Sequence, residues 1–533
     1  MRIVLRNGLF ASAVALSLAC GAPRAEALVC AGDCDVSNSV TVDEILTLIT
    51  SALAGSAPEG CAVADVDGNG QVTVDEILSA VSYGLAGCPP EDETDLVWRP
   101  SVSLPSLPEA NARGLLDRRG LIHTHSYFSH DACDNMPVKD GVRDEVCFGD
   151  LRRGICQTRH DYIMFTDHPS DFRFAEFPDT LMYRADRGDE LVERNDRPVA
   201  SWSGCPDSEQ RTLIMAGSES GNVMPVGLEQ HVAATPEERE AVYGSASDEA
   251  AQILRANGAV VLLAHTEDRS VEELLSRDID GFEMYNIHAN LLLPQATGMA
   301  VRLLFRLDQK DPGLAHPDLA LLYLISEDPR YLSRWGSVLA AGKHIVTTQG
   351  TDAHRNTLPV LMQDGERVDS FRRLMLWFSN HLLIRPEQDG SWDDRHLKEA
   401  LKQGRLYGAF EILGYPRGFD YHASAGEQIA EMGDEIALSS NPTLKVAAPE
   451  VRGLDRSAPA PELEVRLLRA IEGGFEEVAS GPADIEFTPT VAGAYRAEVR
   501  MVPHHLRDFM STDAASLLGH DYVWIYSNAI YVR

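Results

Sequence analysis

The sequence predicts an α/β protein with a small helical repeat module at its N-terminus and a β-sandwich at its C-terminus. Three observations support this fold class: a segment recurs after 32 residues before residue 89, strand and helix patterns alternate over 110–415, and strand patterns dominate 416–533. The chain has 533 residues, of which 44% are hydrophobic, so several domains can each bury a core.

Residues 1–27 have the features of a secretory signal peptide. A basic start precedes an apolar stretch at 9–19 that is too short to span a bilayer, and 25–27 read small-x-small. We therefore expect an exported protein, extracellular or periplasmic, that begins at Leu28 and has no transmembrane span. The alternative is lipid anchoring at Cys20, whose preceding residues match a lipoprotein signal poorly.

Removal of this segment leaves eight cysteines, and an even number in an exported chain indicates up to four disulfides. Their spacing does not fix the pairing, and none is arranged as CxxC. They are Cys30, Cys34, Cys61, Cys88, Cys133, Cys147, Cys156 and Cys205. The formal net charge of -34 excludes non-specific nucleic-acid binding and favours cations.

Each copy of the repeat is a twelve-residue acidic loop followed by a helix pattern, as in calcium-binding loops. The expected ligands are Asp33, Asp35, Ser37, Ser39, Thr41 and Glu44 in the first loop and Asp65, Asp67, Asn69, Gln71, Thr73 and Glu76 in the second. Gly70 serves the sharp turn of the second loop, whereas Asn38 stands in the first, where we expect weaker Ca²⁺ binding. The alternative is a pair of acidic helix caps without calcium. Residues 28–88 resemble the dockerin type I module, which implies a cohesin-like or surface partner.

Residues 89–109 are rich in proline, serine and acid, as an interdomain linker would be. In the α/β region at 110–415 we expect strands at 162–165, 213–216, 259–264, 282–285 and 344–348, in a parallel barrel or sheet. Residues 394–406 have a helix pattern, and the sandwich strands are expected at 463–469, 485–489, 494–502 and 522–533.

Metal-ligand residue types stand at the ends of the expected strands of the α/β region, where the chemistry of such folds is placed. His123 and His125 are two residues apart on an extended segment, so their rings point the same way. The other candidates are His130, Asp131, Asp167, His168, Glu219, His265, Asp352 and His354. Each alone is more often structural, but together they indicate two or three transition-metal ions: Zn, Mn or Fe.

These segments resemble the PHP family of metal-dependent phosphoesterases. The family's HxH and SDG motifs correspond to 123–125 and 129–131, its TDH to 166–168, its GxE to 217–219, and its SDAH to 351–354, with His265 as a further ligand. The resemblance implies a distorted seven-stranded α/β barrel with three metals and nine ligands. His130 stands where the family has an acid and Asp131 follows, so either could be the ligand. Asn222, His231 and His288 are the candidates for the ninth ligand.

The resemblance implies hydrolysis of a phosphoester by a metal-activated hydroxide. Asp167, Asp352 and His354 are the candidate catalytic residues, with Asp167 and Asp352 orienting ligands or accepting a proton. Arg173, Arg211 and Arg355 are candidate anion clamps, and Glu283 is expected to shape the pocket. Residues 397–407 and 524–532 resemble exported PHP proteins related to carbaryl hydrolase, which adds carbamate, ester or amide hydrolysis as an alternative. A calcium-dependent binding protein without catalysis is the other alternative.

Overall fold

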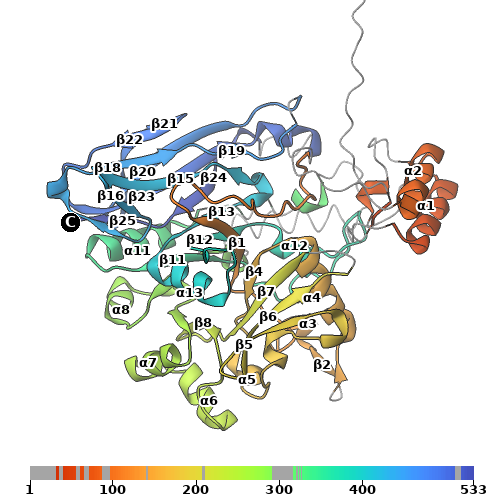
Figure 1. The fold of residues 1–533 in the computed structure, drawn as a ribbon, viewed down its shortest axis with the longest axis horizontal. Coiled ribbons are helices and arrows are strands. Elements are labelled where there is room, and N and C mark those ends of the chain that lie inside the picture. The colour runs from red at the N-terminus through yellow and green to blue at the C-terminus, as the bar shows by residue number, and fades with distance from the viewer. Residues whose placement is uncertain are drawn as a thin grey trace, which may run out of the picture.

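The computed structural model describes most of the chain, and its elements are labelled in Figure 1. The described residues are 32–34, 40–55, 61–64, 71–86, 97–139, 142–206, 210–290, 316–319, 322, 325, 327–455, 457–510 and 518–533. The expected signal peptide with Cys20 lies outside them, as do Cys30 and Cys88.

The N-terminal module contains the two helices that the repeat predicts, α1 (Val42–Ala54) and α2 (Val74–Ala86). Thr41 caps α1: its hydroxyl accepts a hydrogen bond from Glu44 N–H, and its own N–H donates to Glu44 Oε2 at 2.7 Å. The two helices share a small hydrophobic core, and the Cys34–Cys61 disulfide links the two repeats.

The α/β region is built around three parallel strands, β1 (Leu116–Ile122), β4 (Tyr162–Met164) and β7 (Arg211–Gly217). Nearly all of their side chains are buried, because packed elements cover both faces of the sheet. The strands expected at 162–165 and 213–216 are confirmed.

The next strands bring the chain back towards β1. β8 (Met224–Leu228) is antiparallel to both β7 and β9 (Val260–Leu262), and β10 (Gly281–Asn286) is parallel to β11 (Val346–Gly350). The expected wholly parallel arrangement is therefore wrong at β8. The connection from β7 to β8 is too short for the crossover that a parallel neighbour needs.

Backbone hydrogen bonds join these strands into a closed circuit. Leu263 N–H donates to Gly281 O, which sets β9 beside β10. Beyond the ends of β1 and β11, Asp352 N–H donates to His123 O and His125 N–H donates to Ala353 O. The circuit runs through β1, β4, β7, β8, β9, β10 and β11.

Two asparagine side chains hold the outer edge of β11. Gln349 N–H donates to Asn380 Oδ1 at 2.9 Å, and Asn380 Nδ2 donates back to Gln349 O at 2.8 Å. Asn528 makes the same pair of contacts with Thr347, each at 2.9 Å. The side-chain amides thus replace a neighbouring strand and fix the position of β11, which precedes Asp352.

The large sheet continues on the other side of β1 through β12 (Ser379–Ile384), β13 (Leu406–Ala409) and β24 (Tyr522–Ser527). Strands from both sides of residue 416, where the sequence patterns change, therefore belong to one sheet. A second, antiparallel sheet has the order β16-β15-β18-β22, and its side chains share one hydrophobic core with β20 and β23. Antiparallel strands therefore dominate this part of the chain, as expected, although β17 (Glu435–Ile436) and β25 (Ile530–Val532) pair in parallel.

The remaining elements connect and cover these sheets. The other strands are β2 (Val138–Lys139), β3 (Val142–Arg143), β5 (Glu190–Arg194), β6 (Arg197–Gly204), β14 (Pro416–Arg417), β15 (Asp420–Ala425), β16 (Gln428–Glu431), β17 (Glu435–Ile436), β18 (Thr443–Ala447), β19 (Glu450–Val451), β20 (Glu462–Ile471), β21 (Gly474–Gly481), β22 (Ile485–Phe487), β23 (Gly493–Val502) and β25 (Ile530–Val532). The other α-helices are α3 (Ala132–Asn135), α4 (Glu145–Gln157), α5 (Pro169–Phe172), α6 (Pro236–Tyr243), α7 (Asp248–Ala256), α8 (Val271–Ser276), α9 (Ile287–Asn290), α11 (Pro329–Ala340), α12 (Phe371–Met375) and α13 (Asp394–Gln403).

The described part of the expected linker is not a free spacer. Trp98 and Leu104 are buried in the main core, and Trp98 N–H donates to Gly453 O at 2.7 Å. None of the helices in the described ranges has the length and hydrophobicity of a membrane span.

Candidate metal centre

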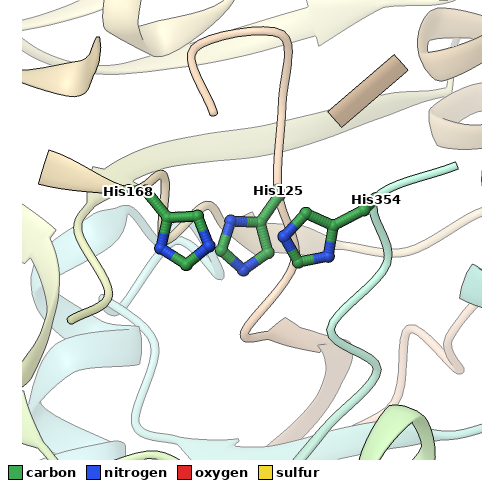
Figure 2. A group of neighbouring side chains, drawn as sticks. All are labelled: His125, His168 and His354. Carbon is green, nitrogen blue, oxygen red and sulfur yellow. The ribbon is translucent and has the colours of Figure 1, made fainter. Parts of the chain in front are cut away.

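The histidines and acids that follow the circuit's strands lie together at its carboxyl ends. Figure 2 shows three of them, His125, His168 and His354, in a row of rings that come from separate segments. The rings of His125 and His354 are nearly parallel, with their centroids 3.7 Å apart, and the ring centroids of His125 and His168 are 4.6 Å apart.

In one half of the cluster, the histidine rings surround the carboxylate of Asp352. Its Oδ1 lies 3.2 Å from His123 Nε2 and 3.1 Å from His125 Nε2. Its Oδ2 lies 3.4 Å from His265 Nε2 and 3.2 Å from His288 Nδ1. One buried carboxylate thus lies close to histidines from three different parts of the chain.

Asp131 and Glu219 serve the other half. Asp131 Oδ2 lies 3.3 Å from both His168 Nε2 and His354 Nε2, and Glu219 Oε2 lies 3.0 Å from His168 Nδ1. Within this cluster, four groups of three ligand atoms, each within 4.8 Å of one another, could hold metal ions. They are His125, His168 and His354; His123, His125 and Asp352; His123, Glu219 and His265; and His288, Asp352 and His354.

Five of the histidines have Nδ1 close to a protein acceptor and Nε2 turned towards the carboxylates of the cluster. The Nδ1 contacts are His123 to Glu283 Oε1 at 2.7 Å, His125 to Ser129 Oγ at 2.8 Å, His168 to Glu219 O at 3.0 Å, His265 to Glu267 Oε1 at 3.4 Å, and His354 to Asp352 O at 2.9 Å. Such contacts orient a metal-binding imidazole and leave Nε2 as the ligand atom.

The donor set fits a metal ion. Among the described residues, the buried atoms His123 Nε2, His125 Nε2, His354 Nε2 and Asp131 Oδ1 have no hydrogen-bond partner. A buried polar atom left without a partner costs free energy, and a metal ion placed between these atoms would remove that cost. Imidazole with carboxylate, and no thiolate, suits Zn²⁺, Mn²⁺ or Fe²⁺.

Three of the expected ligands have left-handed backbone conformations. The φ angles are 70° at His123, 51° at His265 and 53° at Asp352. Residues with side chains adopt such angles only where the surrounding structure imposes them, and they are concentrated at functional sites. At each of these positions the strand turns sharply, which directs the side chain into the cluster.

The acids of the cluster create a strongly negative environment. Burial alone would lower the histidine pKa values, yet the neighbouring carboxylates raise the pKa of His123 to about 10, of His168 to about 11 and of His265 to about 12. His125 and His354, buried beside other histidines, have lowered pKa values. Cations are therefore favoured at this position.

His130 and Asp131 are adjacent in the sequence but have different surroundings. His130 is 59% exposed and its Nδ1 contacts Ser170 Oγ at 3.0 Å, whereas Asp131 lies between two cluster histidines. Asp131 is therefore the residue that the fold offers as a ligand.

Among the candidates for the ninth ligand, the structure brings only His288 to the cluster. Asn222 Nδ2 donates to Gly244 O at 2.8 Å, and His231 contacts Tyr243 Oη and Ala175 O. Each of these two side chains is engaged elsewhere.

Asp167 has an orienting position. Its carboxylate accepts hydrogen bonds from Ser126 N–H at 2.6 Å and Ser126 Oγ at 2.7 Å, directly after the two histidines that follow β1. Burial raises its pKa to about 6, although the Ser126 hydrogen bonds oppose the increase. Its side chain fixes the course of the ligand loop.

The three candidate anion clamps are paired with acids. Arg173 contacts Glu240, Arg211 lies 3.2 Å from Glu190, and Arg355 Nε lies 2.9 Å from Asp150 Oδ2. Arg211 is at the start of β7, the opposite end from Glu219. Each of the three guanidinium groups is thus paired with a carboxylate and is not free to bind an anion.

One acid of the cluster was not predicted from the sequence. Glu267 contacts His265 Nδ1 and accepts a hydrogen bond from the Tyr331 hydroxyl. The available signal was an acid two residues after a candidate histidine. Glu283 contacts His123 and accepts from His265 N–H at 3.1 Å, in keeping with its expected role in shaping the site.

The two expected calcium loops are described only in part. Asp35, Ser37, Ser39, Asp65, Asp67 and Asn69 lie outside the described residues. Glu76 Oε2 accepts hydrogen bonds from Thr73 N–H at 2.7 Å and Thr73 Oγ1 at 2.9 Å, the same arrangement that Glu44 makes with Thr41. The last acid of each loop thus also caps its helix.

Six of the eight cysteines form disulfides among the described residues: Cys34–Cys61, Cys133–Cys147 and Cys156–Cys205. Disulfides of this kind are typical of oxidising compartments.

A small, open pocket adjoins the cluster. Its apolar wall consists of Ile287, Leu358, Val368 and Leu374, and its polar residues are His288, Thr351, Asp352, His354, Thr357 and Asp369. No lysine or arginine is among these described lining residues.

Fold and site together define an α/β protein in which a buried cluster of histidines and carboxylates could hold metal ions. No family model, curated protein or solved structure matches this chain.

Proposed function

We propose that this chain is an exported metal-dependent hydrolase of the PHP type. The observation that carries the proposal is the set of five histidines whose Nδ1 atoms are held by protein acceptors while their Nε2 atoms face shared carboxylates. The circuit of seven strands that surrounds them supports a PHP-type barrel. The three disulfides support export.

Metal ions bound here would activate water at neutral pH and stabilise the negative charge that develops on the substrate. The chain's own part is to hold them. His123, His125 and His265 supply nitrogen donors around Asp352, and His168 and His354 do so around Asp131. Glu283 and Glu267 fix two of the rings.

The family resemblance favours phosphoesters as substrates. The pocket favours a second candidate, hydrolysis of a neutral ester, carbamate or amide with an apolar group. Ile287, Leu358 and Leu374 would exclude water from such a group, whereas the described lining offers no lysine or arginine to a phosphate. The calcium repeats would attach the enzyme to a cohesin-like or surface partner.

The test is a panel of nitrophenyl phosphate, ester and carbamate substrates, assayed with the full chain before and after chelation and after return of Mn²⁺ or Zn²⁺. Calcium is kept constant, because its loss could unfold the N-terminal module. His125→Ala and Asp352→Ala should abolish activity, and His231→Ala is the matched control, since His231 lies away from the cluster.

Elemental analysis supplies the independent measurement. More than about two equivalents of transition metal beside calcium are expected from the donor set. Calcium alone would refute the enzyme proposal, and a metal-loaded protein that is inert on every substrate class would favour a binding protein.

A further inference from the structure

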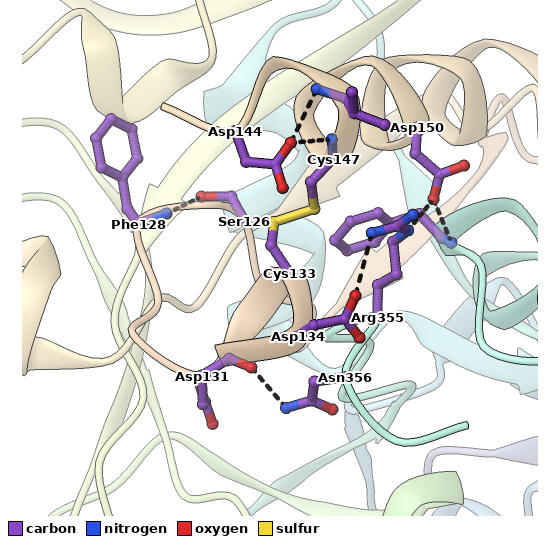
Figure 3. The surroundings of a disulfide bond; sticks show 12 residues. Ser126, Phe128, Asp131, Cys133, Asp134, Asp144, Cys147, Asp150, Arg355 and Asn356 are labelled. Atoms are coloured by element: carbon purple, nitrogen blue, oxygen red, sulfur yellow. Dashed lines mark hydrogen bonds and ion pairs between the residues drawn. A yellow bond between two sulfur atoms is a disulfide. The ribbon is translucent and has the colours of Figure 1, made fainter. Parts of the chain in front are cut away.

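The Cys133–Cys147 disulfide lies directly behind the loop that carries Asp131 (Figure 3). Cys133 is two residues after Asp131, and Cys147 is in the first turn of α4. Both half-cystines are buried. The disulfide thus connects a loop of the candidate metal centre to a packed helix.

The loop has a backbone conformation that it would not keep by itself. The short segment α3 (Ala132–Asn135) is not a regular α-helix: Cys133, Asp134 and Asn135 have φ angles of 55°, 59° and 62°, three successive left-handed residues without a glycine. Such a run is higher in free energy than the right-handed alternative, so external contacts must impose it.

Hydrogen bonds join this loop to the one that carries His354. Cys133 N–H donates to His354 O at 3.0 Å and Asp134 N–H donates to Arg355 O at 3.2 Å. Asn356 Nδ2 donates to Asp131 O at 2.7 Å. These hydrogen bonds tie the two loops to each other, and Asp131 Oδ2 lies beside His354 Nε2.

Helix α4 anchors both loops. It holds the first through Cys147 and the second through Asp150, whose carboxylate lies 2.9 Å from Arg355 Nε. Figure 3 shows both anchors on the same helix. Arg367 adds a two-point contact with Asp134 at 2.7 and 2.8 Å.

We propose that the Cys133–Cys147 disulfide is a positioning element of the metal centre. It imposes the left-handed run, holds Asp131 between His168 and His354, and so sets the affinity for the ion bound by this half of the cluster. This inference rests on the proposed metal centre.

The test compares two disulfides of the same helix. Cys133→Ser with Cys147→Ser removes the proposed positioning element, and Cys156→Ser with Cys205→Ser removes a disulfide at the other end of α4. The control disulfide, Cys156–Cys205, joins residues 49 positions apart, whereas Cys133–Cys147 joins residues 14 positions apart. Loss of the control disulfide should therefore destabilise the chain at least as much. Zn²⁺ affinity and equivalents are measured by calorimetry and elemental analysis on the demetallated full chain, with calcium constant.

We expect the first variant to bind one ion about 10- to 100-fold more weakly, the effect typical of lost support behind a metal ligand, while the control binds like the wild type. In an Asp131→Asn background the same cysteine substitutions should cause no further loss, because the disulfide acts through Asp131. If the serine variant does not fold, Cys133→Val with Cys147→Ala fills the same buried space with apolar groups.

Equal affinity in the wild type and the Cys133/Cys147 variant would overturn this inference alone, as would equal losses in both disulfide variants. Further loss in the Asp131→Asn background would also contradict it. A wild-type protein that binds no transition metal would overturn both this inference and the proposed function.

Discussion

Glu283 fixes the ring of His123 through a 2.7 Å contact between its Oε1 and Nδ1. The two residues come from strands that are not adjacent, because Glu283 is on β10, His123 follows β1, and β11 lies between them in the circuit. Gly350 makes room for the contact, since a Cβ at this position would overlap the Glu283 carboxylate. The pair therefore decides which imidazole nitrogen faces Asp352.

Replacement of Glu283 tests this orientation. Glu283→Gln keeps the size of the side chain and removes its charge, so we expect Zn²⁺ affinity to fall about 10- to 100-fold. Calorimetry on the demetallated chain measures the change, with Glu273→Gln as the control on α8. An unchanged affinity would show that Glu283 does not support a ligand.

Adjacent substitutions test the choice between His130 and Asp131. Asp131→Asn should lower the number of bound transition-metal ions, because it removes a charge between His168 and His354. His130→Asn should leave the number unchanged, since the ring is 59% exposed. Elemental analysis after dialysis compares the two variants, and the reverse result would assign the ligand to His130.

His381, which lies away from the cluster, should make the free energy of unfolding depend on pH. Burial lowers its pKa, but Asp117 at 2.9 Å and Glu411 at 3.3 Å raise it to about 9. Because the folded-state pKa is the higher one, its contribution is full below about pH 6.5 and disappears as pH rises through about 9.

His381→Gln should therefore lower the free energy of unfolding by about 3 kcal/mol more at pH 6 than at pH 10. Urea unfolding at the two pH values measures the difference, and His520→Gln is the exposed control. Parallel pH profiles for the wild type and His381→Gln would refute the assignment.

Leu358 tests the substrate class. It is half-buried in the apolar wall of the pocket, so Leu358→Arg introduces a cation where the described lining has none. We expect the kcat/KM ratio of nitrophenyl phosphate to the neutral ester to rise about tenfold. Leu358→Met is the control for packing, and an unchanged ratio would place the substrate elsewhere.

Calcium binding should differ between the repeats. Glu76→Gln and Glu44→Gln each remove the expected last ligand of a loop, and we expect Glu76→Gln to abolish the tighter site. Calcium titration measures both. Loss of the tighter site in Glu44→Gln instead would reverse the assignment, which rests on Gly70 in one loop and Asn38 in the other.

Ligands at strand ends could be predicted because each stands in a local pattern. An apolar run followed at once by His265, or by Asp352 and His354, is visible in a few residues. By contrast, β8 was missed, since a short strand without alternation gives no local signal. Glu267 was missed because its role depends on the turn at His265, which only the packed fold defines.

The sequence by itself determined the repeat, the strands that precede the candidate ligands and the residue types of those candidates, because these depend on residue spacing within one segment. Only the tertiary structure placed Asp131 and His288 in the cluster, left His130 exposed, and paired the arginines with acids. Those choices depend on distances between residues from separate segments, such as Asp131 and His354, which come together through the fold and not through any local pattern.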